Sequence, residues 1–324
     1  MDPVLFRADL DRKPEVLNQL ADHLDTSNPW SATTITTTDR IVFIGMGSSH
    51  YANAIAAARL QALGINAVAT LASSDLLPKV DSNSMVIVVS ASGGSVETVH
   101  AAQHYSGTCR TISLTNVESS PIADLCDINI PINAEPELGG VACRSYQNTI
   151  ALLLSMQQHL APQSMTTSVP ELVRMSAQAC TELLETSEQW LPAVSELLLG
   201  PTGTAFVAPA SRFCNAQQSA LMLREGPRLN AVGCETGDWS HVDVYLTKTT
   251  DYRMLLFPHS QWEPALIEWC ESRGSTIVSA GGELPNAKFT IRYPHDTIED
   301  VQLLTEVLIA ELVAARAWLS QATN

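Results

Sequence analysis

The chain has 324 residues, of which 45% are hydrophobic and 16% charged, and its formal net charge is −16. This composition supports a sizeable core and excludes a disordered chain, while the length suggests two domains or one large one. A protein with this excess of acidic residues lacks the basic surface that nucleic-acid binding needs. The negative charge also argues against an anionic membrane as a partner. We therefore expect neither a nucleic-acid partner nor a membrane partner.

Targeting and cofactor signals are missing from the sequence. Its first residues carry charges and no continuous apolar stretch, which argues against a signal peptide, and no run of about 18 apolar residues predicts a membrane span. Seven cysteines lie far apart without a CxxC pair, which fits neither a disulfide framework nor a zinc site. The histidines lack metal-ligand spacing such as HExxH. We expect a cytoplasmic protein without a metal or another cofactor.

Short apolar strands alternate with helices through the first half of the chain. Residues 1–38 predict a helical arm followed by a Ser/Thr-rich stretch. The next predicted strands are 41–44, 66–70, 85–89, 111–114 and 128–130, and the predicted helices among and after them include 51–63 and 148–160. This alternation is typical of a parallel sheet that helices cover on both faces.

The second half repeats this layout after a long predicted helix at about 169–199. Its predicted strands are 204–207, 254–257, 276–279 and 289–292, and its predicted helices are 214–224, 262–272 and 298–320. We therefore predict an α/β protein of two α/β/α sandwiches with parallel sheets, of the flavodoxin-like doubly wound type. The expected parts are a helical arm (1–38), a first domain (39–165), and a crossover helix with a second domain (166–324).

A first Ser- and Gly-containing turn, GMGSSH at 45–50, follows the strand at 41–44 and leads into a helix. Free backbone amides at a helix start hold anions, and Gly47, Ser48 and Ser49 stand at that start. A dinucleotide-binding loop would have a third glycine where His50 stands and an acidic residue about 20 positions later. The turn therefore disfavours NAD and suits a phosphate group.

A second turn, SASGGS at 90–95, follows the buried strand MVIVV and offers the hydroxyl groups of Ser90, Ser92 and Ser95 beside Gly93. Because the chain has only four lysines, backbone amides and hydroxyls would have to hold an anion here. Such a turn can also merely cap a helix. Two of them after strands of one parallel sheet favour a ligand site, because α/β folds bind ligands at that edge.

These turns resemble those of the sugar isomerase (SIS) domain family. The run SASGGSVET is similar to the family signature S-x-S-G-[ET]-[ST]-x-[DE]-T, and GMGSS is similar to its first loop. Over about residues 40–320 the arrangement resembles the isomerase half of glucosamine-6-phosphate synthase, the ketosamine-6-phosphate deglycases and the sugar-phosphate deaminases. The resemblance implies two SIS-type domains whose turns hold the phosphate of a phosphorylated sugar or amino sugar. It implies no glutamine amidotransferase activity, because the sequence has no counterpart of the synthase's glutaminase domain.

Two further segments match the family. ELGGVACRSY is similar to its E-x-G-V-A-[ST]-[TS]-[KR]-x-[FY] stretch, which implies that Ala142 and Arg144 contact the sugar. SALMLREGPRLNAVGCETGDWSH resembles its catalytic segment, which implies Glu225 as the catalytic glutamate and His241, 16 residues later, as the ring-opening histidine. Proton transfer between C1 and C2 needs a base and an acid, and a glutamate beside apolar residues and a histidine suit these roles.

Simpler interpretations of these residues remain open. Glu225 also reads as an ordinary charge at a helix end, and His241 as a structural histidine. Glu235 and Asp238 are nearby acids that could serve as the base instead.

The sequence also departs from the synthase. Gln218 and Met222 stand where the synthase has a glutamate and a lysine, and Val242 and Asp243 follow the histidine where the family usually has Gly-Pro. The C-terminal tail contains no lysine, so a Schiff-base mechanism is not expected. The remaining Glu/His pair predicts a phosphosugar isomerase, or a ketosamine-6-phosphate deglycase or deaminase. A non-catalytic phosphosugar sensor is the alternative. The resemblance further implies a homodimer with sites shared between subunits.

Overall fold

The computed structural model describes residues 1–322, which form two compact units. The first unit comprises residues 15–137 and 142–174, and the second comprises residues 1–14, 138–141 and those from 175 onward. Two of the four limits between them fall within helices, α2 (Lys13–Thr26) and α7 (Val169–Glu185), and the other two flank the short segment 138–141.

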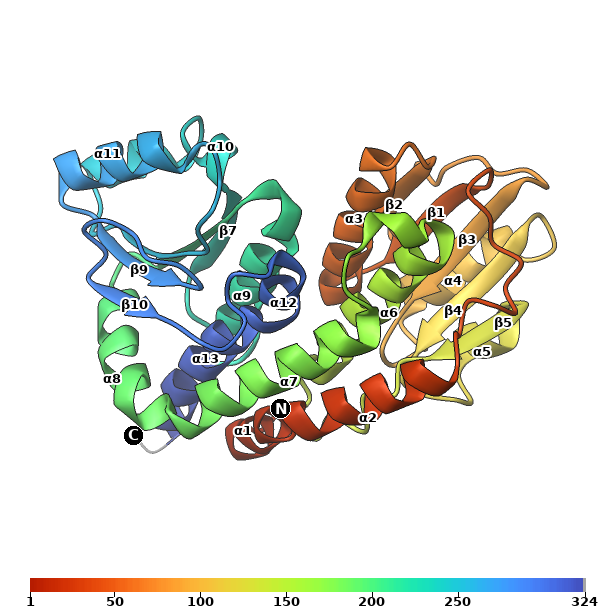
Figure 1. Ribbon diagram of the computed structural model, residues 1–324, viewed down its shortest axis with the longest axis horizontal. Helices are drawn as coiled ribbons and strands as arrows, with labels where there is room; N and C mark the ends of the chain where they lie inside the picture. The colour runs from red at the N-terminus through yellow and green to blue at the C-terminus, as the bar shows by residue number, and fades with distance from the viewer. Residues whose placement is uncertain (323–324) are drawn as a thin grey trace. The chain divides into compact units, whose positions relative to one another are not determined.

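A five-stranded parallel sheet with strand order β2-β1-β3-β4-β5 forms the centre of the first unit (Figure 1). Its strands are β1 (Arg40–Gly45), β2 (Ala67–Leu71), β3 (Ser84–Val89), β4 (Arg110–Thr115) and β5 (Ile128–Pro131). Its remaining helices are α3 (Gly47–Ala62), α4 (Val96–Tyr105), α5 (Pro121–Leu125), α6 (Arg144–Leu160) and the 3-10 helix η1 (Pro162–Ser164). Every residue of β3 is buried, as expected of a strand covered on both faces.

The two faces of this sheet are covered by different helix pairs. Val42 and Ile44 of β1 and Val86 of β3 pack against α4 and α5 in one apolar cluster. The helices α3 and α6 pack against each other, and α3 also lies along β1 and β2. The helices thus bury the strands from both sides.

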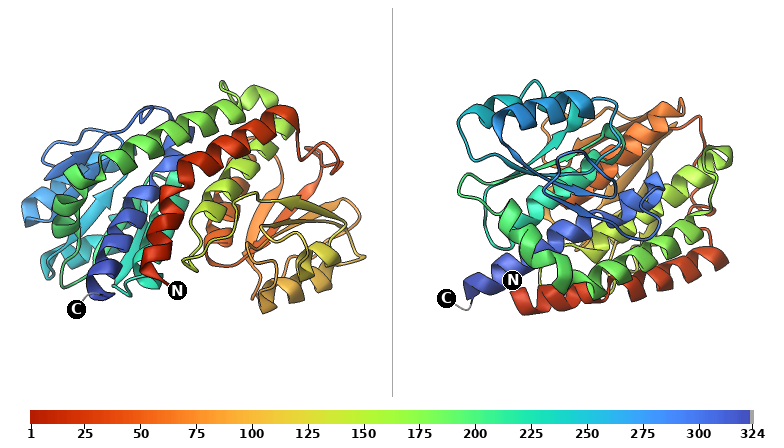
Figure 2. Two further views of the ribbon diagram at one scale, coloured as in Figure 1. Left: turned by 90° about the horizontal axis from the view of Figure 1, so that it is seen from below. Right: turned by 60° about the vertical axis from the view of Figure 1, so that its left-hand side comes forward.

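The second unit contains another five-stranded parallel sheet, with strand order β10-β9-β8-β6-β7. Its strands are β6 (Thr204–Ala208), β7 (Ala231–Glu235), β8 (Arg253–Leu256), β9 (Thr276–Ala280) and β10 (Phe289–Ile291). Its helices are α1 (Pro3–Asp11), α8 (Ser187–Leu198), η2 (Ala210–Arg212), α9 (Phe213–Glu225), α10 (Thr236–Trp239), η3 (Asp243–Lys248), α11 (Glu263–Arg273), α12 (Glu299–Thr305) and α13 (Val307–Ala322). Helix α1 packs along α13 (Figure 2).

Both sheets have the same topology. When the strands of each unit are numbered along the chain, both orders read 2-1-3-4-5, which is the flavodoxin-like doubly wound order. The predicted fold is therefore confirmed, including the α/β class and the parallel sheets. In such a sheet, strand 2 is added on one side of strand 1 and strands 3 to 5 on the other, so the strand order reverses between strands 1 and 3. These strands are β1 and β3 in one unit and β6 and β8 in the other.

The short helices α5 and α10 and the 3-10 helices were not predicted, and the structure differs from the predicted elements in three further places. Strand β7 was not predicted, because it is an edge strand that contains Gly233 and an exposed Val232 instead of an apolar run. The helix predicted at 169–199 is two helices that meet at Thr186, and the one predicted at 298–320 is divided at Glu306. Among residues 1–322, no helix combines the length and the apolar character needed to cross a bilayer.

Candidate functional site

The two Ser- and Gly-containing turns of the first unit lie at adjacent strand ends. Strands β1 and β3 are hydrogen-bonded parallel neighbours, so the turn at 45–50 and the turn at 90–95 leave the same edge of the sheet side by side. This edge is the point of reversal in the strand order, where open α/β sheets bind their ligands. The structure thus brings together the seven residues predicted to hold a phosphate, which are Gly47, Ser48, Ser49, Ser90, Ser92, Gly93 and Ser95.

The first turn presents an uncapped helix start. Met46 has an extended backbone and its side chain makes no capping hydrogen bond to α3. The helix begins at Gly47, which has a φ of +49°, and Ser48 and Ser49 in its first turn are partly exposed. The amides at such a start carry partial positive charge and attract an anion. Ser48 and Ser49 add hydroxyl donors to them.

The serines of the second turn differ in exposure. Ser90 is buried at the end of β3, whereas Ser92 is exposed and its Oγ accepts a hydrogen bond from the Gly94 amide at 3.4 Å. Ser95 precedes α4 without capping it by its side chain, and its hydroxyl bonds to that of Thr98. The start of α4 is therefore a second helix N-terminus without a side-chain cap at this edge of the sheet.

Gly93 fixes the shape of the second turn. Its φ is +66°, its amide donates to the Ser90 carbonyl at 3.0 Å, and its carbonyl accepts from the Ile122 amide at 3.1 Å. A Cβ at this position would overlap Ser120 and lie 2.7 Å from Thr115 Oγ1. Only glycine fits this backbone conformation and this space together.

We expect Gly93→Ala to destabilise the first unit by roughly 2–4 kcal/mol, through overpacking and the left-handed backbone. The control is Gly64→Ala, because Gly64 has a similar φ of +79° but no atom within 4 Å of its Cβ position. The Gly64→Ala variant should lower the free energy of unfolding by only about 1–2 kcal/mol. Urea unfolding measures both values, and equal losses in the two variants would contradict the steric role of Gly93.

Two further polar residues, Asn53 and His50, lie near the first turn, and sequence reasoning missed Asn53. Asn53 of α3 is fully buried, and neither its amide nitrogen nor its amide oxygen has a hydrogen-bond partner within residues 1–322. A Cβ on Gly45 would lie 2.8 Å from Asn53 Nδ2, so this amide packs on the end of β1. His50 is partly buried, and desolvation lowers its pKa despite a hydrogen bond to the Thr70 backbone. The only sequence signal for Asn53 is a single amide within an alanine-rich helix.

The segment predicted to contact the sugar is held by internal bonds. Arg144 is buried, and its guanidinium pairs with Glu135 at 3.2 Å and donates to the Pro136 carbonyl at 2.6 Å. Ala142 is partly buried just before it. The sugar contact of these two residues stays a prediction.

Glu137 is a further residue that sequence reasoning did not single out. Its carboxylate accepts hydrogen bonds from the Cys143 amide at 2.7 Å, the Ser145 amide at 3.0 Å and the Ser145 hydroxyl at 2.6 Å. A carboxylate at the start of α6 is favoured by the helix dipole. Glu137 therefore fixes the loop that leads into α6.

Glu225 belongs to the second unit and is the last residue of α9. Its side chain is half-buried, and desolvation raises the pKa of its carboxyl group above the ordinary value, although the charge of Arg224 opposes this. A carboxylate with raised proton affinity is suited to general base catalysis. Gln218 and Met222, which stand where the synthase has ionisable groups, lie on the same helix and are fully buried. Gln218 Nε2 lies 3.7 Å from Met222 Sδ.

His241 also belongs to the second unit, where it is exposed between α10 and η3. Trp239 and Asp243, two positions before and after His241, both form a hydrogen bond with the hydroxyl group of Tyr252. Trp239 Nε1 donates to Tyr252 Oη at 2.8 Å, and Tyr252 Oη donates to Asp243 Oδ2 at 2.7 Å. Of the alternative acids, Glu235 caps α10 through the amides of residues 237 and 238. The segment that carries His241 is therefore anchored at both ends.

Within the described part of the chain, no three His, Cys, Asp or Glu side chains gather as metal ligands.

Comparisons with known proteins show what this fold is similar to. Residues 34–157 match the family model described as SIS domain. The chain is 24% identical over 213 residues to a glutamine–fructose-6-phosphate aminotransferase (isomerizing) of Sulfurisphaera tokodaii, and the match covers 65% of this chain but only 35% of that protein. Among solved structures, the C-terminal domain of glucosamine-fructose-6-phosphate aminotransferase from Francisella tularensis has a TM-score of 0.81 at 15% identity, covering 98% of this chain and 96% of that one. Tagatose-6-phosphate ketose/aldose isomerase from Escherichia coli also has a TM-score of 0.81, at 17% identity, covering 98% and 93%.

Proposed function

We propose that the protein is an enzyme that acts on a 6-phosphorylated sugar or amino sugar, because residues 34–157 match the SIS domain family. The reaction would be an aldose–ketose isomerisation, or the related removal of an amine from a ketosamine 6-phosphate. The observation that carries the proposal is the meeting of two uncapped helix starts and their serines where the strand order of the first sheet reverses.

Phosphate binding is assigned to this edge of the first sheet. The helix starts of α3 and α4 supply amides and dipoles, and Ser48, Ser90 and Ser92 are among the hydroxyl donors. The two turns contain no lysine or arginine, so the dianion would be held by neutral donors. Binding energy from the phosphate would then position the sugar carbons for reaction.

Proton transfer is assigned to Glu225 and His241. The Glu225 carboxylate would take the proton from one of the carbons C1 and C2 and return it to the other, so that no external oxidant or reductant is needed. His241 would donate to the ring oxygen, or to the leaving nitrogen of an amine adduct. The raised pKa of Glu225 supports its role as the base.

We also propose that two copies of the chain pair and that His241 completes the site of its partner. The exposed position of His241 and the exposed apolar residues that follow it, Val242 and Tyr245, support this. Sedimentation combined with an activity assay tests it. A strictly monomeric form with full activity would overturn the shared site.

Proton NMR in D2O with a panel of hexose 6-phosphates and fructosamine 6-phosphates tests the proposed reaction. An isomerase or deglycase should exchange a C1 or C2 proton for deuterium, and the product identifies the reaction. If a ligand binds demonstrably but neither exchange nor product appears, the protein is a phosphosugar sensor and the catalytic proposal fails. If no sugar phosphate binds, the phosphate assignment fails as well.

The pH dependence of kcat/KM provides a further prediction. A base acts only when ionised, and the pKa of Glu225 is raised above its ordinary value of 4.5. We therefore expect kcat/KM to fall as the pH drops through a pKa above 4.5 and to level off above that pKa. Glu225→Gln should abolish this limb, whereas Glu235→Gln should retain it. Loss of the limb in Glu235→Gln alone would make Glu235 the base.

A further inference from the structure

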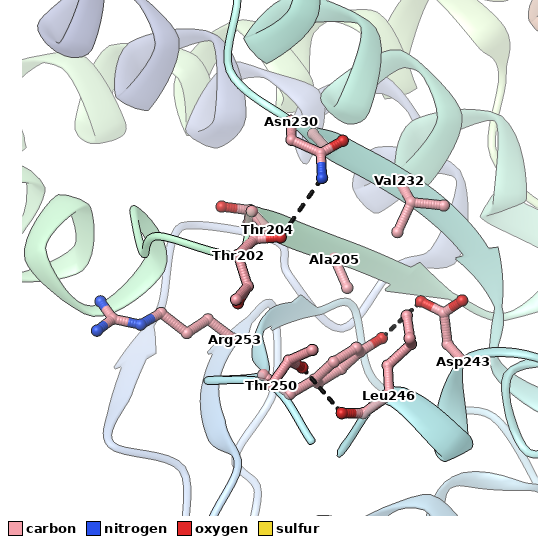
Figure 3. A pocket seen from close by; sticks show the side chains of 12 residues that line it. Thr202, Thr204, Ala205, Asn230, Val232, Asp243, Leu246, Thr250 and Arg253 are labelled. Carbon is pink, nitrogen blue, oxygen red and sulfur yellow. Dashed lines mark hydrogen bonds between the residues drawn. The ribbon is translucent and has the colours of Figure 1, made fainter. Parts of the chain in front are cut away.

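A cavity of about 200 Å³ lies within the second unit at the amino-terminal end of its sheet (Figure 3). The starts of β6, β7 and β8 form one wall, and η3 forms another. No residue assigned to phosphate binding, sugar contact or proton transfer lines it. The opposite, carboxyl-terminal sheet edge is the one where α/β folds usually bind ligands, so the fold alone does not account for this cavity.

A buried carboxylate stands on the wall of this cavity. Asp243, at the start of η3, is only 5% exposed, and its Oδ2 accepts a hydrogen bond from Tyr252 Oη at 2.7 Å. Burial and then the charge of Asp243 raise the pKa of the nearby Cys234 thiol, as they do that of Tyr252. Both neighbours are therefore neutral, and neither supplies a positive charge to the carboxylate.

No cation of the described chain neutralises Asp243. Among residues 1–322, no Lys, Arg or His side chain forms an ion pair with it. Arg253 lines the same cavity, but its guanidinium points away from it, pairs with Asp251 at 2.7 Å and donates to the Glu196 carbonyl at 2.8 Å. Buried charges are normally paired, because an isolated one loses its hydration without replacement.

Three apolar side chains line other parts of the cavity, so its ligand needs an apolar portion. Ala205 and Val232 face each other across the β6–β7 register, and Leu246 of η3 adds a third apolar side chain. A cavity of about 150 Å³ holds benzene in another protein, so this one accommodates a molecule somewhat larger than benzene. A divalent metal ion requires more oxygen or nitrogen ligands than one carboxylate supplies.

We propose that this cavity binds a small organic ammonium ion, with its charged group against Asp243 and its apolar body against Ala205, Val232 and Leu246. The ammonium supplies the positive charge that the carboxylate lacks, and the body fills the apolar part of the space. This site is separate from the phosphate turns and does not depend on the proposed reaction.

The test compares 2-phenylethylamine with its uncharged counterpart 2-phenylethanol, by calorimetry and by NMR shifts of the backbone signals of Ala205, Val232 and Leu246. We expect the amine to bind at least tenfold more tightly than the alcohol at pH 7 and to shift these signals. Equal affinities for the two probes, or no shift at these residues at 10 mM amine, would overturn the proposal.

Three variants assign the binding to this cavity. Asp243→Asn retains an acceptor for Tyr252 but removes the charge, so it should abolish the preference for the amine. Val232→Trp fills the cavity from the exposed edge strand and should block both probes while leaving the carboxylate in place. Glu188→Gln, which removes an exposed charge of α8, is the matched control and should bind like wild type. An unchanged amine preference in Asp243→Asn, or unchanged binding in a folded Val232→Trp, would refute the site.

Discussion

Replacing Glu225 by glutamine is expected to lower the turnover of the sugar phosphate by about 10²–10⁴-fold, the usual contribution of a general base. The amide has almost the shape of the carboxylate but cannot take a proton from carbon. Substrate affinity should stay within about threefold of wild type, because the phosphate turns belong to the first unit and are unchanged. Deuterium incorporation at C1 or C2 measures the turnover, and calorimetry measures the affinity.

The matched control for this experiment is Glu196→Gln, which removes an exposed carboxylate from α8 of the same unit. It should retain wild-type turnover and so account for any general effect of net charge. A Glu225→Gln protein with more than a tenth of wild-type turnover would show that Glu225 is not the base. A loss of affinity at unchanged turnover would instead make it a binding residue.

The second large effect is expected at a buried ion pair of the second unit. Lys13, at the start of α2, and Glu311 of α13 are both fully buried, and Nζ lies 2.5 Å from Oε2. Lys13→Met keeps the length of the side chain but leaves the Glu311 charge without this cation. Breaking one partner of such a pair costs about 3–5 kcal/mol. Urea unfolding followed by circular dichroism should show a loss of this size.

Two comparisons separate the charge effect from packing. The double variant Lys13→Met with Glu311→Leu should recover most of the lost stability, because it removes both charges of the pair. Arg7→Met breaks the exposed Arg7–Asp11 pair of α1 and should cost less than about 1 kcal/mol. If the double variant is as unstable as Lys13→Met, lost packing rather than charge is the cause.

The elements whose signals are local were predicted from the sequence. Strands such as β1 and β3 are short apolar runs between turn residues, and helices such as α3 and α9 follow Ser-containing turns, so their existence did not depend on distant contacts. Edge strand β7 has only one neighbouring strand, and only Ala231 and Cys234 of its five residues are buried, so its sequence lacks an apolar run. The breaks at Thr186 and Glu306 likewise leave no clear signal in the apolar pattern.

The candidate site likewise contains residues that could be recognised from the sequence and residues that could not. The serines and glycines of the two turns were recognisable because phosphate binding at a helix start uses consecutive residues. Their meeting at one sheet edge depends on β1 lying beside β3 rather than beside β5, which only the strand order decides. Asn53 was not recognisable, because an isolated amide in a helix has no pattern until its burial is known.

The sequence by itself determined that the chain folds into two parallel α/β sheets and that the first carries two turns suited to a phosphate group, because both properties depend on neighbouring residues. The tertiary structure decided the environment of the charged side chains. Arg144 pairs with Glu135, Lys13 pairs with Glu311, and Asp243 is buried on a cavity wall without an ion pair from any residue in 1–322. Electrostatic interactions depend on distance and desolvation in the folded state, and the spacing of residues along the chain contains neither.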